Sequence, residues 1–300
     1  MIILEGTSLF ETKAALERIQ LSEILLKLRE MRKKLRLTVV AVLAATVLFS
    51  LTSCDKEPVD QRPDLAPVES MMMDFSDFAS SPAGTKSSAL SYDNFLFSYL
   101  AVGYWNASAV LVSAIPVAAY AHALTQTAEY MGDNTWEWSF EFPLSGLNYL
   151  ATLTGKRLNN EEFSMEMVIS LASLPNQGVK WFDGVVRYDH TKADWTFYKE
   201  GSNPVLDVAW NKDFETEEAD LTYTYVEADQ EETGSYIMWE YSPEEVFDGA
   251  YTVSMSEGMT NIEWNTTTIE GRVKSPVFFE DENWHCWDSY ANGLADIDCE

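Results

Sequence analysis

Three cysteines are the residues of this sequence best suited to covalent chemistry. Cys54 follows a basic stretch, a short apolar run and two small residues, whereas Cys286 and Cys299 lie close together near the C-terminal end. A thiol can be acylated, oxidised to a disulfide or recruited to a metal ion. The surroundings of each cysteine therefore decide which chemistry we expect of it.

The segment before Cys54 has the order of parts found in an export signal. Residues 31–36 include four basic side chains, and the apolar run from Leu37 to Phe49 is too short to span a bilayer, which takes roughly 20 residues. Leu51-Thr52-Ser53-Cys54 resembles the lipobox of bacterial lipoproteins, in which a peptidase cuts before a cysteine linked to diacylglycerol. The resemblance implies that Cys54 carries lipid and that the protein is anchored in the bacterial cell envelope, at the outer membrane. The alternative is an ordinary core helix that precedes a cysteine.

The same segment sets the predicted domain boundaries. The basic start at Met31 makes residues 1–30 an over-extended N-terminus and residues 31–53 the signal peptide. Proline, serine and acidic residues in 54–87 predict a flexible tether, in which residues 71–75 either dock on the domain or begin a short helix. Residues 88–300 then form a single globular domain. Asp55, the residue after the predicted lipidated cysteine, does not decide whether the domain faces the periplasm or the cell surface.

Charge excludes one class of partner. Without residues 1–54, the chain keeps 12 of its 20 basic and 43 of its 48 acidic residues. Nucleic-acid binding needs clustered Lys and Arg, so we expect no nucleic-acid partner. The acidic run from Asp213 to Asp220 lacks the ligand spacing of a calcium loop, which favours a solvated surface over a cation site. No cofactor or metal is predicted, and the oligomeric state stays open.

The two C-terminal cysteines and their neighbours allow three interpretations. Cys286 and Cys299 predict a disulfide in an exported chain, and His285 offers a metal alternative that lacks any matching ligand spacing. Ten tryptophans are present, and core packing is their ordinary use. A further hypothesis is that Trp284, Trp287 and Asp288 form a disulfide-braced platform that binds a sugar ring.

A charge-free stretch predicts the helices of the domain. No Asp, Glu, Lys or Arg occurs from Asn94 to Gln126. We expect helices over about 91–113 and 116–131, the second beginning at Pro116, and we expect both to be buried because they are apolar on most faces.

Beyond residue 135 the apolar residues alternate with polar ones, which predicts half-buried antiparallel strands to about residue 275, followed by a C-terminal tail over 276–300. The predicted fold class is mainly β with an N-terminal helical pair (α+β): a curved meander of about 9–11 strands, half-barrel or barrel-like. The predicted strands span residues 136–142, 163–171, 179–188, 193–199, 205–210, 221–226, 235–241, 250–255, 262–264 and 269–274.

This order of elements resembles the half-barrel of the lipoprotein carriers LolA and LolB, over about residues 90–275. The resemblance implies that a curved sheet and a helical lid enclose a site for acyl chains. It transfers no individual binding residue. We expect such a pocket to be bounded by Leu100, Val110, Ile115 and strand aromatics.

Motifs for catalysis are missing from the sequence. There is no nucleophile elbow, phosphate loop, dinucleotide fingerprint or zinc-protease motif. Glu137 and Glu141 share a strand face, but acidic residues are so frequent that such a pair has little weight as a glycosidase site. The sequence therefore favours a non-enzymatic envelope lipoprotein that binds an apolar or amphiphilic ligand. A glycan-binding lipoprotein is the alternative, and an envelope hydrolase is third.

Overall fold

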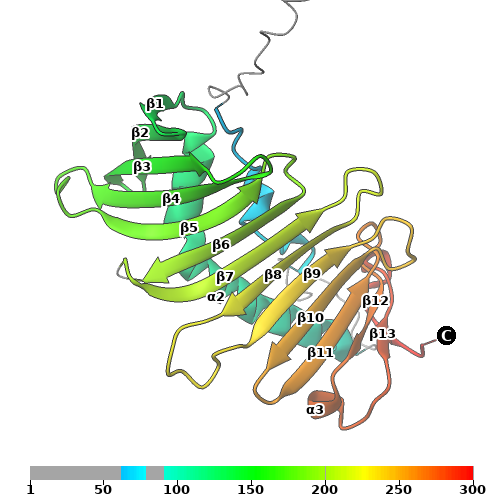
Figure 1. The fold of residues 1–300 in the computed structure, drawn as a ribbon. Helices are drawn as coiled ribbons and strands as arrows, with labels where there is room; N and C mark the ends of the chain where they lie inside the picture. The colour runs from blue at the N-terminus through cyan, green and yellow to red at the C-terminus, as the bar shows by residue number, and fades with distance from the viewer. Residues whose placement is uncertain (1–61, 79–90, 200, 300) are drawn as a thin grey trace, which may run out of the picture. The chain divides into compact units, whose positions relative to one another are not determined.

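Antiparallel strands dominate the computed structural model, which describes residues 62–78, 91–199 and 201–299. The strands form a 14-stranded sheet in which each strand pairs with the next along the chain (Figure 1). The predictions for residues 1–30, 31–53 and Cys54 lie outside the described residues. The strands are β1 (Glu129–Gly132), β2 (Thr135–Leu144), β3 (Leu147–Arg157), β4 (Glu162–Leu171), β5 (Val179–Arg187), β6 (Lys192–Lys199), β7 (Asn203–Lys212), β8 (Ala219–Tyr225), β9 (Tyr236–Tyr241), β10 (Gly249–Met255), β11 (Gly258–Trp264), β12 (Gly271–Lys274), β13 (His285–Trp287) and β14 (Asp296–Ile297).

The mainly β prediction is confirmed, with more strands than expected. The alternating pattern predicted most of β2, β4 to β10 and β12 and the last three residues of β11, whereas β1, β3, β13 and β14 are additional. The sheet is open and not a closed barrel, because its order ends at β1 and β14, which pair with β2 and β13 only.

One face of the sheet is apolar. Side chains facing it stand opposite one another across successive strands, as in the pairs Phe182 with Phe197 and Trp195 with Val208. These side chains are at most a few per cent exposed, while the polar residues between them face the other way. The alternation of apolar and polar residues along each strand therefore gives the sheet one packed face and one solvated face.

Several glycines on the packed face lie directly opposite tryptophans. Gly184 pairs with Trp195, and the indole of Trp195 covers the place where a side chain of residue 184 would begin. Gly249 pairs with Trp264, and Gly271 pairs with Trp287. Each indole can lie flat over the neighbouring strand only because that strand presents no Cβ there.

A long helix, α2 (Asp93–Ala123), packs on the apolar face of the sheet (Figure 1). Its contacts run from β12 to β14 near one end, through β6 and β7, to β2 and β3 at the other. The prediction of two helices separated at Pro116 is wrong, because the helix continues through this buried proline and residues 129–131 belong to β1. Proline costs one backbone hydrogen bond, and burial of the surrounding helix against the sheet offsets that loss.

Other parts of the chain fix both ends of α2. At the start, the carboxylate of Asp296 accepts the backbone N–H groups of Asp93 and Asn94 at 3.1 and 3.0 Å. The side-chain amide of Asn94 donates to the carbonyl of Cys286 at 2.8 Å. Near the end, the buried Tyr120 hydroxyl donates to the carbonyl of Ala66 at 2.9 Å. The helix start, whose N–H groups lack partners within the helix, is thus capped by β14.

Residues 62–78, here called the strap, also pack on the apolar face. The tether prediction is wrong for this segment, because Met71, Phe75 and Phe78 are buried in the core. The docking expected for residues 71–75 is confirmed. The strap contains two short 3-10 turns, η1 (Val68–Ser70) and η2 (Ser76–Phe78).

Buried aromatic side chains bind the backbone of the strap. The Tyr223 hydroxyl donates to the carbonyl of Met71 and accepts the N–H of Met73, at 3.0 and 2.8 Å. Tyr251 donates to the carbonyl of Asp74 at 2.7 Å, and the indole of Trp264 donates to the carboxylate of Asp77 at 2.8 Å. The bonds of Tyr223 and Tyr251 satisfy backbone groups of an irregular segment that would otherwise be costly to bury, and the bond from Trp264 holds a side chain of the same segment.

Replacing Gly184 by alanine should destabilise the domain. The new Cβ would lie 2.5 Å from the carbonyl oxygen of Asp194 and against the indole of Trp195, so strands or ring must shift. We expect a loss of about 1–3 kcal/mol in the free energy of unfolding, measured by urea titration. Gly103→Ala in α2 is the matched control, because nothing lies within 4 Å of its Cβ position. Equal unfolding midpoints for Gly184→Ala and the unaltered protein would contradict the close-packing argument.

Candidate functional site

Among the residues singled out from the sequence, the C-terminal cysteines are joined. Cys286 in β13 and Cys299 form a disulfide, as the sequence predicts. Because Cys286 also accepts the amide of Asn94, and the adjacent β14 caps α2 through Asp296, the disulfide fastens the segment that holds the helix start. Its role is structural. Cys54 lies outside the described residues.

The structure does not bring Trp284, Trp287 and Asp288 together as a sugar platform. Trp287 is 1% exposed, and its indole donates to the carbonyl of Ile269 at 2.5 Å inside the core. Trp284 instead lies under the guanidinium of Arg272, 4.4 Å from the ring centre. The platform hypothesis is therefore wrong for Trp287, because a side chain buried in the packed face of the sheet cannot contact a sugar.

The metal alternative at His285 also receives no support from the geometry. The ring stacks on Phe279 at 3.8 Å, and its Nε2 lies 3.1 Å from a carboxylate oxygen of Asp281. In the described part of the chain, no group of three or more His, Cys, Asp or Glu side chains is placed to hold a metal ion.

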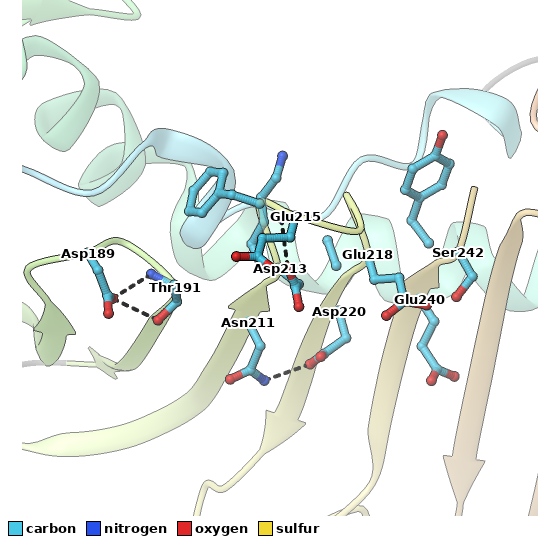
Figure 2. A pocket seen from close by; sticks show the side chains of 13 residues that line it. Asp189, Thr191, Asn211, Asp213, Glu215, Glu218, Asp220, Glu240 and Ser242 are labelled. Carbon is cyan, nitrogen blue, oxygen red and sulfur yellow. Dashed lines mark hydrogen bonds between the residues drawn. The ribbon is translucent and has the colours of Figure 1, made fainter. Parts of the chain in front are cut away.

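A wide acidic recess of about 790 Å³ lies between the ends of β7, β8 and β9 (Figure 2). Its carboxylates are engaged locally: Asp213 accepts the backbone N–H groups of Glu215 and Thr216, and Asp220 accepts the side-chain amide of Asn211. Burial, with the nearby charges of other carboxylates, raises the pKa of Glu240. The recess is open and polar, so it is a solvated surface and not an enclosed site.

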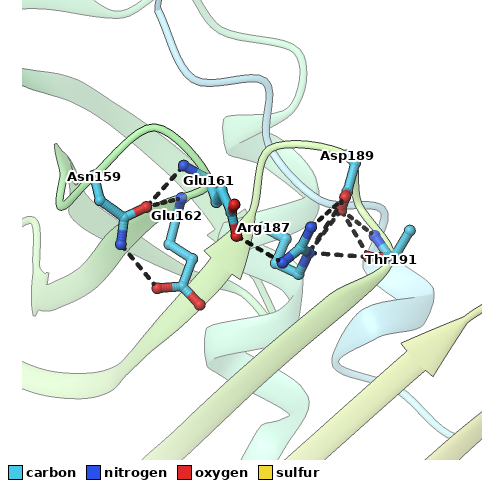
Figure 3. A network of polar contacts seen from close by, with 6 residues as sticks. All are labelled: Asn159, Glu161, Glu162, Arg187, Asp189 and Thr191. Carbon is cyan, nitrogen blue, oxygen red and sulfur yellow. Dashed lines mark hydrogen bonds and ion pairs between the residues drawn. The ribbon is translucent and has the colours of Figure 1, made fainter.

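A second polar cluster stands at the turn between β5 and β6 (Figure 3). Arg187 donates to Asp189 through Nε and Nη2, the latter at 2.7 Å, and pairs with Glu161 at 3.2 Å. Thr191 donates its backbone N–H and its hydroxyl to the same carboxylate of Asp189. In this turn, His190 also has its Nε2 3.0 Å from the carbonyl oxygen of Asp64 in the strap. The cluster therefore holds the conformation of the turn, and His190 of this turn contacts Asp64 of the strap.

The recess best suited to a ligand lies between α2 and strands β7, β8 and β10. This recess, here called the crevice, has a volume of about 350 Å³. Its walls are largely apolar, and Glu231 and Glu232 stand among the few charged groups. Binding sites for small molecules commonly have about 300–1,000 Å³ and an apolar lining with few polar groups. The lining residues are Tyr104, Trp105, Ser108, Ala109, Val112, Val205, Leu206, Tyr225, Gln230, Glu231, Glu232, Ser235 and Met255.

One polar atom in the wall of the crevice has no partner. Trp105 is 5% exposed, and its indole N–H meets no hydrogen-bond acceptor among the described residues. A buried donor without an acceptor costs about 1–3 kcal/mol, so a ligand oxygen that reached it would remove an existing penalty.

A second hollow of about 390 Å³ adjoins the crevice. The two share Val112 of α2, Val205 of β7 and Tyr225 of β8 in their walls. The second hollow is additionally lined by Lys180, which pairs with Asp183 at 2.6 Å. Burial and the bond to Glu227 raise the pKa of Tyr225 to about 12, so this phenol stays neutral between the hollows.

The sequence predicted a pocket under the helix but not its walls. Leu100, Val110 and Ile115 were expected to bound it, yet none of them lines either hollow. Leu100 and Val110 are 59% and 53% exposed, and Val110 lines a separate recess of about 760 Å³ between α2 and the strap. Trp105 and Val112 line the crevice instead, because they project from the opposite side of the same helix. The charge-free stretch identified the helix, but no pattern in it could show which side meets the sheet.

No protein-family model matches the chain, and neither a curated protein nor a solved structure matches it.

Lowering the pH should weaken the turn that holds Asp189. Hydrogen bonds from Arg187 and Thr191 keep the pKa of this carboxyl well below its usual range. Because the folded pKa is depressed, the stabilisation is complete above the unfolded value of about 3.9 and is lost as the pH falls through the folded pKa. We expect Asp189→Asn to lower the urea midpoint at pH 7 and to differ progressively less from the unaltered protein below about pH 4.

Asp133→Asn serves as the control, because Asp133 is 88% exposed in its pair with Lys156 and should alter the midpoint little at any pH. A deficit of Asp189→Asn that stayed constant from neutral to acid pH would argue against a charge effect.

Proposed function

We propose that this chain is a non-enzymatic lipoprotein of the bacterial cell envelope, anchored through Cys54, that binds an apolar or amphiphilic ligand in the crevice beside α2. Support for the anchor comes from the order of basic, apolar and small residues before Cys54. In the described part of the chain, the buried Pro63 already belongs to the strap, and it lies nine positions after Cys54.

The buried, unpartnered indole N–H of Trp105 in the wall of an apolar crevice carries the ligand proposal. Val112 and Val205 offer apolar contact on facing elements, and the missing acceptor marks where a ligand oxygen would lie. An amphiphile combines both properties, because its chain loses contact with water while its polar end accepts a hydrogen bond. An apolar recess of about 760 Å³ between the strap and α2 has no unpartnered side-chain donor among its lining residues.

Extraction of the purified protein with organic solvent, followed by mass spectrometry, should release an amphiphilic molecule. Val112→Trp should reduce the recovered amount strongly, because Val112 belongs to the walls of both hollows and a larger side chain would fill them. Ala107→Trp is the matched control: Ala107 lies on the same helix, is exposed and lines neither hollow. Equal recovery from the two variants would overturn the crevice as the site.

Trp105→Phe tests the hydrogen bond separately. The change keeps an aromatic ring in the wall and removes the N–H donor, so affinity for the extracted molecule should fall by up to about tenfold. Titration into delipidated protein, followed by intrinsic fluorescence or calorimetry, measures this change. Unaltered affinity would show that the ligand makes no bond to residue 105.

A further inference from the structure

The face of α2 turned away from the sheet is apolar and exposed. Leu111 is 87% exposed, Leu100 is 59% exposed and Tyr104 is 56% exposed. Ala107 and Ala114 lie on the same helix face, since the five residues recur every three or four positions. We call these five residues the stripe. Packing on the sheet does not require these apolar residues, because Phe95, Trp105 and Tyr120 pack on the sheet from the opposite face of the helix.

Beyond Asp93, the helix that carries the stripe has no charged side chain, while Glu231, Glu232 and Lys180 of other elements line the two hollows beside it. No Asp, Glu, Lys or Arg occurs from Asn94 to Ala128, although the whole chain carries a net charge of −28. An exposed apolar helix face of this kind marks an interaction site on a protein whose overall charge is strongly negative. By length and composition α2 could cross a membrane. Its packing on seven strands of the sheet makes it a core helix that shows one side outward.

We propose that the stripe rests on the bilayer that holds the acyl chains of Cys54, an inference that depends on the lipoprotein function proposed above. Arg62 lies eight positions after Cys54, and an extended chain of that length reaches at most about 28 Å. The strap enters the domain at α2 itself, where Ala66 bonds to Tyr120. Tyr120 lies six residues from Ala114, about 9 Å along the helix axis. The anchor therefore keeps the stripe within reach of the membrane surface.

Charge favours a bilayer over a second copy of the chain as the partner. Two bodies that each carry 43 acidic and 12 basic residues beyond Cys54 repel one another. A zwitterionic lipid surface has no such repulsion, and tyrosine and leucine are well suited to its interface. Because the stripe has no Lys or Arg, anionic lipids should weaken the contact.

The position of the stripe also connects the membrane with the crevice. Tyr104 belongs to both the stripe and the crevice wall, and Leu111 belongs to the stripe and the second hollow. With the stripe on the bilayer, both hollows open beside the lipid surface. An amphiphile could then move between bilayer and crevice without its apolar part crossing water.

The test uses the acylated protein, purified from membranes and reconstituted in phosphatidylcholine vesicles. A fluorophore sensitive to polarity is attached at Ala107→Cys, the centre of the stripe, while Cys286 and Cys299 remain in their disulfide. We expect a blue shift and quenching by nitroxide-labelled lipids at this position. The same label at Glu141→Cys, which is exposed on the solvated face of the sheet, should show neither effect.

Charged substitutions provide the second arm. Leu100→Glu combined with Leu111→Glu should abolish lipid quenching at position 107, because two carboxylates would then face the bilayer. Leu147→Glu combined with Leu158→Glu is the matched control, since these leucines are 50% and 52% exposed on hairpins of the sheet. Mixing phosphatidylglycerol into the vesicles should reduce quenching in the unaltered stripe.

Three outcomes would overturn the proposal. One is an unquenched label at position 107 although mass spectrometry shows acylated Cys54. Another is that the unaltered protein sediments as a dimer whereas the double glutamate variant sediments as a monomer, because a second copy of the chain would then cover the stripe. If Cys54 is not acylated, the lipoprotein proposal fails by itself. Partitioning of the unacylated protein into vesicles then tests the membrane contact of the stripe. A partition coefficient about tenfold lower for the glutamate variant supports the contact, and an unacylated protein that does not partition at all excludes it.

Discussion

The apolar face of the open sheet must be covered along its whole width, and this requirement determines the rest of the structure. Thirteen strand spacings of about 4.8 Å make a surface of roughly 60 Å, whereas a helix of 31 residues is about 46 Å long and only about 10 Å wide. One helix therefore cannot cover the face alone. The strap supplies the remainder. Tyr223 and Tyr251 donate hydrogen bonds to its backbone, and Trp264 donates to the carboxylate of Asp77.

Packing against the sheet requires apolar residues on only one side of α2. The outward side of the helix is apolar as well, and a helix that served the core alone would carry charged residues there. The crevice departs from close packing in a similar way, because it leaves Val112 and Val205 with a gap between them and the Trp105 donor without an acceptor. Both departures occur on the same helix and meet at Tyr104, which is why we attribute them to one function.

The sequence predicted the elements that have a regular period, and it failed where tertiary contacts override local patterns. Strand β3 was missed because its inward positions include Ala151 and Gly155, which are small to accommodate the Phe140 and Trp138 rings on β2, so the alternation is hidden. Pro116 predicted a break in a helix that the sheet holds continuous. The disulfide could be predicted because Cys286 and Cys299 lie close in the sequence of a chain that was expected to be exported. The burial of Trp287 could not, because it depends on the pairing of Trp287 with Gly271 on the neighbouring strand, which no local sequence pattern shows.

The crevice was beyond sequence analysis for a related reason. Its walls come from α2, β7, β8 and β10, and its existence depends on how far the helix stands from the sheet at Val112. That distance follows from the helix ends, where Asp296 holds the start and Ala66 holds Tyr120. The disulfide-linked tail holds the first end and the strap holds the second, so two segments far apart in the sequence position the helix that forms one wall of the crevice. A pull on the strap would act on the Tyr120 end of the helix, next to which the proposed membrane anchor enters the fold.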